Sequence, residues 1–414
     1  MIRHVVGAAT ALVTVLALAA QGPEGVADLM NEAPVRAALA AARTAEMATI
    51  GDQIRLCEIP APPFKEGTRA QTYAEALRAA GLKNVRLDRE GNVLGERPGR
   101  SPTPHLVMSA HLDTVFPEGT DVRVRRIGNV LHGPGIGDDC RGLAVLLAVV
   151  RALDAGKVET SGTITFVGTV GEEGLGDLRG VKALFGETLK GRVDRFISLD
   201  GAGHGITNVS VGSRRYRVTF RGPGGHSYDD FGNANPAHAL GRAMALIGDF
   251  DVPTRPRTTF SVGRIGGGTS VNAIPADAWM EADLRSSDHP ALDALDRRFQ
   301  QAIQRALMLE NDRWKDRGRL TVSIDKIGER AAGRIPDNAP IVEVAMAAGR
   351  AVGLNPQLEE GSTDSNVPMN LGIPAITVAT GPADGTHTLQ ETFDTTDSWR
   401  ATQQAVLLAI ALSR

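Results

Sequence analysis

The sequence predicts an α/β fold in which a smaller domain interrupts a larger one. Predicted strands and helices alternate through the first half of the chain, which is the pattern of a sheet covered by helices. From about Gly212 the order becomes β-α-β-β-α-β, as in the ferredoxin-like unit, and a helix is predicted again at 339–352. We therefore expect residues 20–211 and 329–414 to form one domain with a mixed central sheet, and residues 212–328 to form the insertion.

The elements of the larger domain follow from hydrophobic periodicity and from turn residues. Helices are predicted where apolar residues recur every three or four positions, and strands where β-branched residues form short apolar runs. The expected helices are 35–55, 70–82, 142–153, 339–352 and 398–412. The expected strands are 105–110, 129–132, 163–170, 195–199 and 375–379.

The elements of the insertion are predicted in the same way. Its helices are expected at 235–250 and 290–310, and the second of these has a clear amphipathic pattern. Its strands are expected at 215–221, 258–265, 278–285 and 320–327. This order gives a self-contained layer of about a hundred residues.

The composition is that of a globular chain whose partners are small molecules. The 414 residues are 42% hydrophobic, which is enough for a large core, and 45 Lys and Arg nearly balance 48 Asp and Glu. The positive charges are scattered along the chain. Neither nucleic-acid binding nor a basic membrane-binding patch is therefore indicated.

Residues 1–19 have the pattern of a secretory signal peptide. Arg3 precedes an apolar run that extends from Val5 to Ala20, and Ala17-Leu18-Ala19 offers the small residues that signal peptidase requires. An uncleaved membrane anchor is the alternative, but the run is shorter than the ~18–20 residues of a spanning helix. We expect an exported protein, periplasmic or secreted, with no membrane contact after cleavage.

The two cysteines, Cys57 and Cys140, cannot form a disulfide framework. They could form one bridge if their Cα atoms lie within about 7 Å of each other, or they could be two separate buried thiols. The sequence leaves both alternatives open.

Acidic and histidine side chains follow the predicted strands. The carboxyl ends of strands are where open α/β sheets place their ligand sites, so we expect these side chains to lie close together. They are His111 and Asp113 in HLDT, Asp138 and Asp139 in GPGIGDDCRG, Glu172 and Glu173 after ITFVGTV, Asp200 after FISL, and His387 after TVATGPADGT.

Histidine and carboxylate ligands together favour a divalent transition metal, with zinc expected and manganese or cobalt as alternatives. If Asp113 orients His111, Glu172 serves as a base and only Asp138 of the two loop aspartates is a ligand, five good candidate ligands remain. Five ligands suit two ions about 3.5–4 Å apart that share one carboxylate, and Asp138 is the natural bridge. The candidate ligands are His111, Asp138, Glu173, Asp200 and His387.

The motifs HLDTV, GPGIGDDCRG, GEEGLGDLRG and the final HT resemble the co-catalytic zinc exopeptidases that include peptidase T, glutamate carboxypeptidase and acetylornithine deacetylase. The resemblance covers roughly residues 50–414, and GEEGLGDLRG is most similar to the peptidase T-like members. It implies a zinc domain with a ferredoxin-like lid that often dimerises. It also implies that His111 and Asp200 bind one zinc, that Glu173 and His387 bind the other, and that Asp138 bridges them.

The same resemblance assigns two further roles in the catalytic domain. Glu172 is implied as the general base, which takes a proton from the bridging water and delivers it to the leaving amine. Asp113 is implied as the partner of the far nitrogen of His111, where it fixes the tautomer. A cis peptide bond is implied between Asp138 and Asp139.

The adjacent acids in GEEGLGD need an explanation, because neighbouring residues of a strand face opposite sides. Either one glutamate is merely solvated or the chain turns at this point. Gly171 and Gly174 would allow such a turn, so that Glu173 reaches a metal while Glu172 faces the water.

Four residues outside the cluster resemble substrate-binding residues of the family. His226 in RGPGGHS resembles a lid histidine that reaches the partner's active site in dimers and stabilises the oxyanion. Asn272 in SVNAIPA and Arg285 in EADLRSS resemble residues that hold the substrate's backbone or carboxylate. Gly361 begins the turn GSTDSN, which resembles the substrate-facing turn. We therefore expect a homodimer formed through the lid.

The chain departs from the family where a lysine commonly follows the two loop aspartates. Cys140 and Arg141 stand there instead. Either the positive charge has moved by one residue, or the Cys140 thiol ligates or tunes the metals.

The sequence thus predicts an exported dizinc metallopeptidase of short peptides, with aminotripeptidase or dipeptidase activity favoured. A glutamate-carboxypeptidase-like enzyme or an N-acyl amino acid amidohydrolase is the alternative, favoured if Arg285 binds a substrate α-carboxylate. An inactive metal-binding or peptide-binding protein would have no need of Glu172 as a base. A single-domain dizinc aminopeptidase would lack the insertion.

Overall fold

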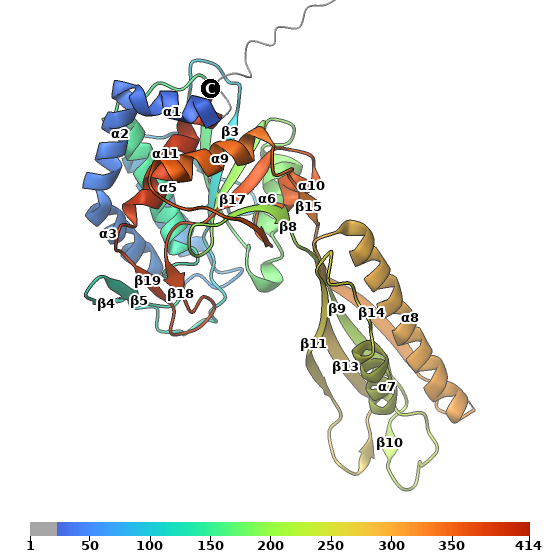
Figure 1. Ribbon diagram of the computed structural model, residues 1–414. Coiled ribbons are helices and arrows are strands. Elements are labelled where there is room, and N and C mark those ends of the chain that lie inside the picture. The colour runs from blue at the N-terminus through green and yellow to red at the C-terminus, as the bar shows by residue number, and fades with distance from the viewer. Residues whose placement is uncertain (1–22, 316) are drawn as a thin grey trace, which may run out of the picture.

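The computed structural model describes residues 23–315 and 317–414. They form a large domain and an elongated small domain that projects from it (Figure 1). The predicted signal peptide, residues 1–19, lies outside the described residues. Among the helices of the described ranges, none is both long enough and apolar enough to cross a membrane.

A mixed sheet forms the centre of the large domain. Its strands in the described chain are β1 (Lys83–Leu87), β2 (Val93–Arg97), β3 (Leu106–His111), β6 (Ile164–Thr169), β7 (Arg195–Leu199), β8 (Ile206–Ser210), β15 (Gly333–Arg334), β16 (Leu358–Gly361) and β17 (Ala375–Val378). Neighbouring strands follow the order β1-β2-β6-β3-β7-β17-β8-β15, and β16 pairs with β8. The four central strands β6, β3, β7 and β17 are parallel, whereas β2 and β8 are antiparallel to them.

Helices pack around this sheet. They are α1 (Pro23–Asn31), α2 (Ala33–Thr44), α3 (Glu46–Cys57), α4 (Gly67–Ala79), α5 (Cys140–Ala155), α6 (Arg179–Ala183), α9 (Pro340–Ala351), α10 (Asn366–Asn370) and α11 (Trp399–Leu412). The buried helix α5 contacts β3 and β7, and α2, α3 and α11 pack against α5 in turn. The core of the large domain therefore lies between α5 and the parallel strands.

The single helix predicted over 35–55 is wrong. The structure has two helices, α2 and α3, which meet at Ala45, where the backbone leaves helical geometry at φ −85° and ψ 5°. Both helices bury one face against α5, and buried residues recur every three or four positions on both sides of the break. Periodicity alone therefore could not locate it. Among the longer elements of the large domain, helix α1 and the strands β1, β2, β8 and β16 were not predicted.

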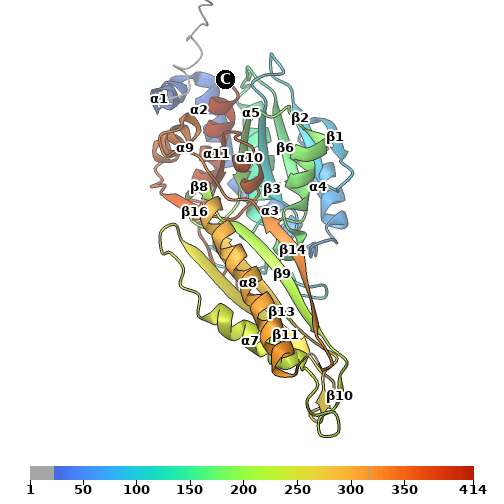
Figure 2. The same cartoon turned by 90° about the vertical axis from the view of Figure 1, so that its right-hand side faces the viewer.

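The small domain comprises residues 212–330. Its main elements are β9 (Gly212–Arg221), α7 (Pro236–Gly248), β11 (Thr258–Gly267), β13 (Asp277–Ser286), α8 (His289–Arg313) and β14 (Thr321–Arg330), in the predicted β-α-β-β-α-β order. The strands form an antiparallel sheet with the order β11-β13-β9-β14. Figure 2 shows α8 lying along this sheet. Alternate residues of β9, such as Val218 and Phe220, pack with both helices in a separate core.

Two short pairings complete the fold. In the small domain, β10 (Gly225–His226) pairs with β12 (Ala273–Ile274), and Figure 1 shows β10 at the end remote from the large domain. In the large domain, a second small sheet has the order β18-β19-β5-β4. Its strands are β4 (Arg125–Ile127), β5 (Val130–His132), β18 (Ala383–Asp384) and β19 (Thr392–Asp394).

Candidate metal centre

The carboxyl ends of β3, β6 and β7 meet at one edge of the central sheet, because these strands are parallel neighbours. His111 is the last residue of β3, Glu172 and Glu173 follow β6, and Asp200 follows β7. All four side chains are buried. The topology thus gathers three acids and a histidine from distant parts of the sequence.

Asp138 joins two groups of potential metal ligands. The ligand atoms of His111, Asp138 and Asp200 lie within 4.8 Å of one another, and so do those of Asp138, Glu173 and His387. His111 Nε2 is 2.8 Å from Asp138 Oδ1, whereas His387 Nε2 is 3.1 Å from Asp138 Oδ2. The two oxygens of one carboxylate therefore face the two histidines.

Glu172 lies beside these groups and not on the solvent side. One of its carboxylate oxygens lies within 4.8 Å of ligand atoms of His111 and Glu173. Gly171 and Gly174 have φ values of 65° and 50°, so the chain does turn directly after the strand, as predicted. The Arg330 guanidinium donates to Glu172 Oε1 at 3.0 Å and to the Glu172 carbonyl oxygen. Burial raises the pKa of Glu172 well above its usual range, and Arg330 opposes this rise.

The electrostatics of the cluster favour bound cations. Burial, reinforced by the neighbouring carboxylates of Asp138 and Glu173, raises the pKa of Asp200 to about 7 despite the opposing effect of His111. Hydrogen bonds to Asp138 and Glu173 raise the pKa of His387 to about 10. Carboxylates so crowded and buried need positive charge, and their oxygens together with two imidazole nitrogens are a donor set that zinc accepts.

Asp113 is positioned to hold the backbone of two site residues. Its Oδ1 accepts the Glu172 N–H at 3.0 Å, and its Oδ2 accepts the Glu173 N–H at 2.8 Å. His111 Nδ1 lies 3.0 Å from the Asp113 carbonyl oxygen and 3.6 Å from Oδ1. Asp113 is thus the partner of His111 Nδ1, as predicted, but the shorter contact is made by its backbone carbonyl oxygen and not by its carboxylate.

Asp139 holds His111 in a similar way. The peptide bond between Asp138 and Asp139 is cis, as the family resemblance implied. The Asp139 carboxylate accepts the His111 N–H at 2.8 Å and the Gly142 N–H at 3.0 Å, and the latter bond caps helix α5. The carboxylate of Asp139 therefore binds backbone N–H groups and fixes the main chain at His111 and at the start of α5.

Arg141 does not replace the family's lysine near the metal ligands. Its side chain is fully buried and forms an ion pair with Glu46 at 2.9 Å, and it donates to the Ser398 carbonyl oxygen at 2.9 Å. The Cys140 and Cys57 thiols are both buried and free, and Cys140 belongs to neither ligand group around Asp138. The neighbouring Cys140 thiol, together with burial, raises the pKa of Cys57.

His226 and Asn272 are not brought to the cluster within one chain. His226 lies in β10 at the remote end of the small domain, with about half of its side chain exposed (Figure 1). Asn272 is close by, since its carbonyl oxygen accepts the Ser227 N–H at 3.0 Å. Neither residue can take part in the chemistry of its own chain in this arrangement.

Arg285 and Gly361 share a cavity of about 260 Å³ between the small-domain sheet and the end of β16. Arg257 and Thr259 also line it, and Thr259 is the cross-strand partner of Arg285. Arg285 Nε donates to Asp283 at 2.6 Å. Ser362, another lining residue, accepts a hydrogen bond from Arg330 at 3.2 Å. Arg330 also donates to Glu172, so the side chains of Ser362 and Arg330 connect this cavity to Glu172.

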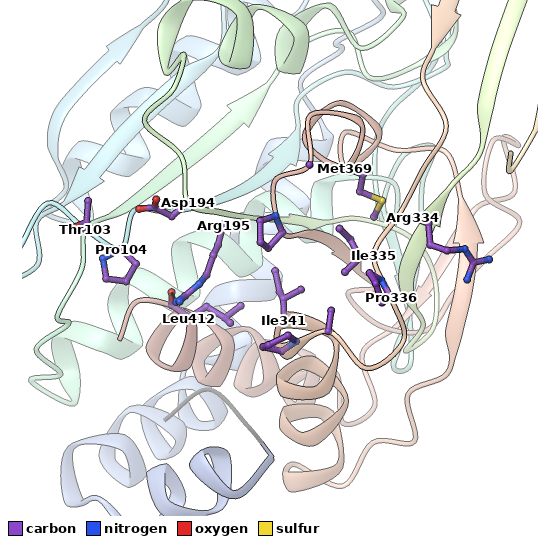
Figure 3. Close-up of a pocket in the computed structure, with 14 residues that line it drawn as sticks. Thr103, Pro104, Asp194, Arg195, Arg334, Ile335, Pro336, Ile341, Met369 and Leu412 are labelled. Atoms are coloured by element: carbon purple, nitrogen blue, oxygen red, sulfur yellow. Dashed lines mark hydrogen bonds between the residues drawn. The ribbon is translucent and has the colours of Figure 1, made fainter. Parts of the chain in front are cut away.

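A larger cavity, of about 720 Å³, lies at the opposite edge of the sheet (Figure 3). Its lining includes Pro104, just before β3, and Arg195, the first residue of β7, so it adjoins the amino ends of the parallel strands. Arg195 points toward Leu412, whereas Arg334 points away from it. The charged groups do not converge, and this cavity is separate from the metal ligands.

Two buried residues of the site were not predicted, Arg330 and Glu391. Glu391 is four residues after His387, and its carboxylate accepts the N–H of Asp138 at 3.0 Å. The motif HTLQE contains this acid beside a candidate ligand, which was a signal that could have been used. Arg330 is the last residue of the strand β14, and its sequence context carries no such signal.

Several known proteins are similar to this chain in sequence or in structure. Carboxypeptidase G2 of Pseudomonas sp. (strain RS-16) is 26% identical over 306 residues, which cover 72% of this chain and 70% of that protein. Succinyl-diaminopimelate desuccinylase of Nitrosospira multiformis is 24% identical over 359 residues, which cover 81% and 90% respectively. The structure is similar to aminopeptidase PepT of Bacillus cereus, with a TM-score of 0.72 at 21% identity, covering 89% of this chain and 99% of that one. It is also similar to the YXEP protein of Bacillus subtilis, described as a dinuclear metal binding peptidase, with a TM-score of 0.64 at 17% identity, covering 89% and 98%. Because the model of peptidase family M20/M25/M40 matches residues 107–412, the chain belongs to that family and is a hydrolase of this type.

Proposed function

We propose that the protein is a two-ion metallohydrolase that cleaves an amide bond of short peptides. The observation that carries this proposal is the position of Asp138, whose two oxygens face two separate histidines. A carboxylate shared in this way suits a pair of ions and not a single ion. The dinuclear metal binding described for the YXEP protein supports the same reading.

The residues present fit two zinc ions. His111 and Asp200 would hold one ion and Glu173 and His387 the other, with Asp138 shared. When bound, such ions polarise the scissile carbonyl group and lower the pKa of a water molecule. Manganese or cobalt would accept the same donors.

Glu172 is the group that moves protons in the proposed reaction. It would take a proton from the attacking water and deliver it to the leaving amine nitrogen. Arg330 holds one oxygen of this carboxylate at 3.0 Å, which leaves Oε2 available to the water. Asp113 fixes the backbone of Glu172 and Glu173, so the base and a ligand are held by one carboxylate.

The decisive test combines metal content with turnover. Purified protein is expected to contain about two divalent ions per chain by elemental analysis, and Glu172→Gln is expected to retain them while losing at least about 100-fold in kcat. Glu187→Gln, which changes an exposed glutamate, is the matched control. Protein without divalent metal, or a fully active Glu172→Gln variant, would contradict the proposal.

For the substrate, we propose an aminotripeptidase or dipeptidase, supported by the peptidase T-like motif GEEGLGDLRG. The cavity that contains Arg285 and Arg257 favours the second candidate, hydrolysis at a residue with a free carboxylate, as in carboxypeptidase G2. A panel of dipeptides, tripeptides and N-acyl amino acids distinguishes the two. Cleavage of N-acyl amino acids alone would exclude the first candidate. An Arg285→Ala variant that raises KM only for substrates with a free carboxylate would support the second.

We also propose that the small domain acts as a lid and dimerisation domain, through which His226 acts on the partner's site. Its support is the exposed position of His226, which its own metal cluster cannot use. Mixing inactive His226→Ala and Glu172→Gln chains should restore activity, because a mixed dimer has one complete site. No recovery in a dimer confirmed by sedimentation would exclude this role.

Export is proposed from residues 1–19 alone. N-terminal sequencing of the protein from the periplasm or the medium should find a start at residue 20. Recovery of the intact leader in the cytosol would exclude export.

A further inference from the structure

Glu391 binds the backbone of the loop that carries Asp138. It is 1% exposed and lies directly before β19. Its Oε2 accepts the Gly135 N–H at 2.9 Å, and its Oε1 accepts the N–H groups of Gly137 at 2.8 Å and of Asp138 at 3.0 Å. One carboxylate thus satisfies three backbone donors within four consecutive residues.

The loop needs such a partner because its sequence makes it conformationally free. Gly133, Gly135 and Gly137 alternate through it, and Gly135 adopts a φ of 79°. A Cβ atom at Gly137 would come within 2.5 Å of Ala383 and 3.3 Å of Glu391 Oε1, so the close approach of the loop requires glycine. These glycines permit the conformation, but they do not hold it.

Glu391 is not itself placed as a metal ligand. Both of its oxygens already accept N–H groups, and it belongs to none of the ligand groups found among the described residues. Asp113 and Asp139 are used in the same manner, the first on Glu172 and Glu173 and the second on His111. A frame of three buried carboxylates therefore holds the main chain of the residues that carry the site.

We propose that Glu391 is a positioning residue that fixes the shared carboxylate of Asp138 through the main chain of residues 135–138. The inference rests on the proposed two-ion function, since Asp138 matters most if two ions share it. Loss of the Glu391 contacts lets the loop move, so that Asp138 no longer serves both groups. The consequence is weaker ion binding, with little change in substrate binding.

The test compares Glu391→Gln with an Asp384→Asn control. Glutamine keeps the size of the side chain, but its NH₂ group must face at least one N–H of the loop. Asp384 is an exposed acid in the neighbouring β18, and its carboxylate accepts the N–H of Gly385 at 2.8 Å, so its variant removes a nearby charge and keeps the contacts of Glu391 with the loop. Zinc affinity is measured by chelator competition on the demetallated protein, and the cobalt-substituted absorption spectrum reports the geometry.

Glu391→Gln is expected to bind zinc about 10–100-fold more weakly and to show an altered cobalt spectrum, with kcat lowered and KM little changed. Asp384→Asn is expected to match the wild type. Wild-type zinc affinity and an unchanged cobalt spectrum in a folded Glu391→Gln variant would overturn the proposal for Glu391. A wild-type protein that binds no zinc would overturn the proposed function instead.

Hydrogen exchange of the wild type gives a test that does not depend on the folding of a variant. The amides of Gly135, Gly137 and Asp138 should be protected in the demetallated protein, because Glu391 binds them without metal. Rapid exchange of these amides beside protected amides in β19 would overturn the proposal.

Discussion

The two oxygens of Asp138 have different partners, and this asymmetry predicts unequal effects of mutating the ligands. Asp138→Asn should lower zinc content from about two ions per chain to less than one, because the side chain that both groups share loses its negative charge and one of its two oxygens. Asp200→Asn should lose one ion, since Asp200 belongs to only one group around Asp138. Elemental analysis after dialysis measures both. Equal loss in the two variants would contradict a shared role for Asp138.

Arg330 and Glu172 form a buried ion pair in which both residues are about 5% exposed. Arg330→Ala leaves a buried carboxylate without its partner and should lower the free energy of unfolding by about 3–5 kcal/mol. Urea denaturation at pH 7 measures this change. The Glu172→Gln/Arg330→Ala double variant is the control and should be more stable than Arg330→Ala alone, because it contains no unpaired charge at this position. A double variant that is as unstable as the sum of its parts would contradict the pairing.

At the scale of elements, the turn after β6 explains how two adjacent acids reach one site. Gly171 has a φ of 65°, and a Cβ atom there would lie 2.7 Å from the Arg179 side chain. Gly171→Ala should therefore destabilise the protein by about 1–2 kcal/mol and lower kcat by shifting Glu172. Gly186→Ala is the control, because its added Cβ meets nothing within 4 Å. Thermal unfolding measures the difference, and equal stability of the two variants would show that the turn tolerates a side chain.

The sequence-based prediction was accurate for elements whose hydrophobic pattern is typical of only one type of secondary structure. Strand β7 has the predicted bounds, and α5, α8 and α11 differ from their predicted ranges by only a few residues, since each is a long or fully apolar segment. The break at Ala45 was missed because buried residues recur every three or four positions on both sides of it. Strand β8 was missed because its sequence ITNVS mixes polar and apolar residues, and β16 was missed because it is short and largely exposed. The pairing of both depends on neighbours distant in sequence.

At the scale of the whole molecule, the candidate metal ligands come from segments that are far apart in the chain. Removal of the ions leaves several buried carboxylates with too little positive charge. Chelation should therefore lower the melting temperature, and added zinc, manganese or cobalt should restore it; ligand at 100 times its Kd stabilises by about 2.7 kcal/mol. Calorimetric scans with and without chelator measure the shift. An unchanged melting temperature, with removal of metal verified, would contradict the site.

His111, Glu173 and Asp200 could be predicted from their places at the ends of β3, β6 and β7, because these parallel strands bring such positions together. Asp138 and His387 lie in loops beside the second small sheet, so for them the motifs and not the strand order carried the prediction. The residues that orient them were harder to find. Arg330 acts from the small domain on Glu172, and Arg141 turns toward Glu46 although it is next to the metal loop. Such contacts depend on the packing of distant segments, which one-dimensional patterns do not contain.

The two connections of the small domain have a mechanical consequence. The chain enters through β9 and leaves through β14, and these strands pair with each other at Ser213 and Arg330. The two connections between the domains are therefore paired strands of one two-stranded ribbon. A rotation of the small domain relative to the large domain would twist this ribbon. The last residue of the ribbon is Arg330, whose guanidinium donates a hydrogen bond to the carboxylate of Glu172. We therefore expect that any rotation of the small domain would move Arg330 and, through this ion pair, the carboxylate of the proposed base.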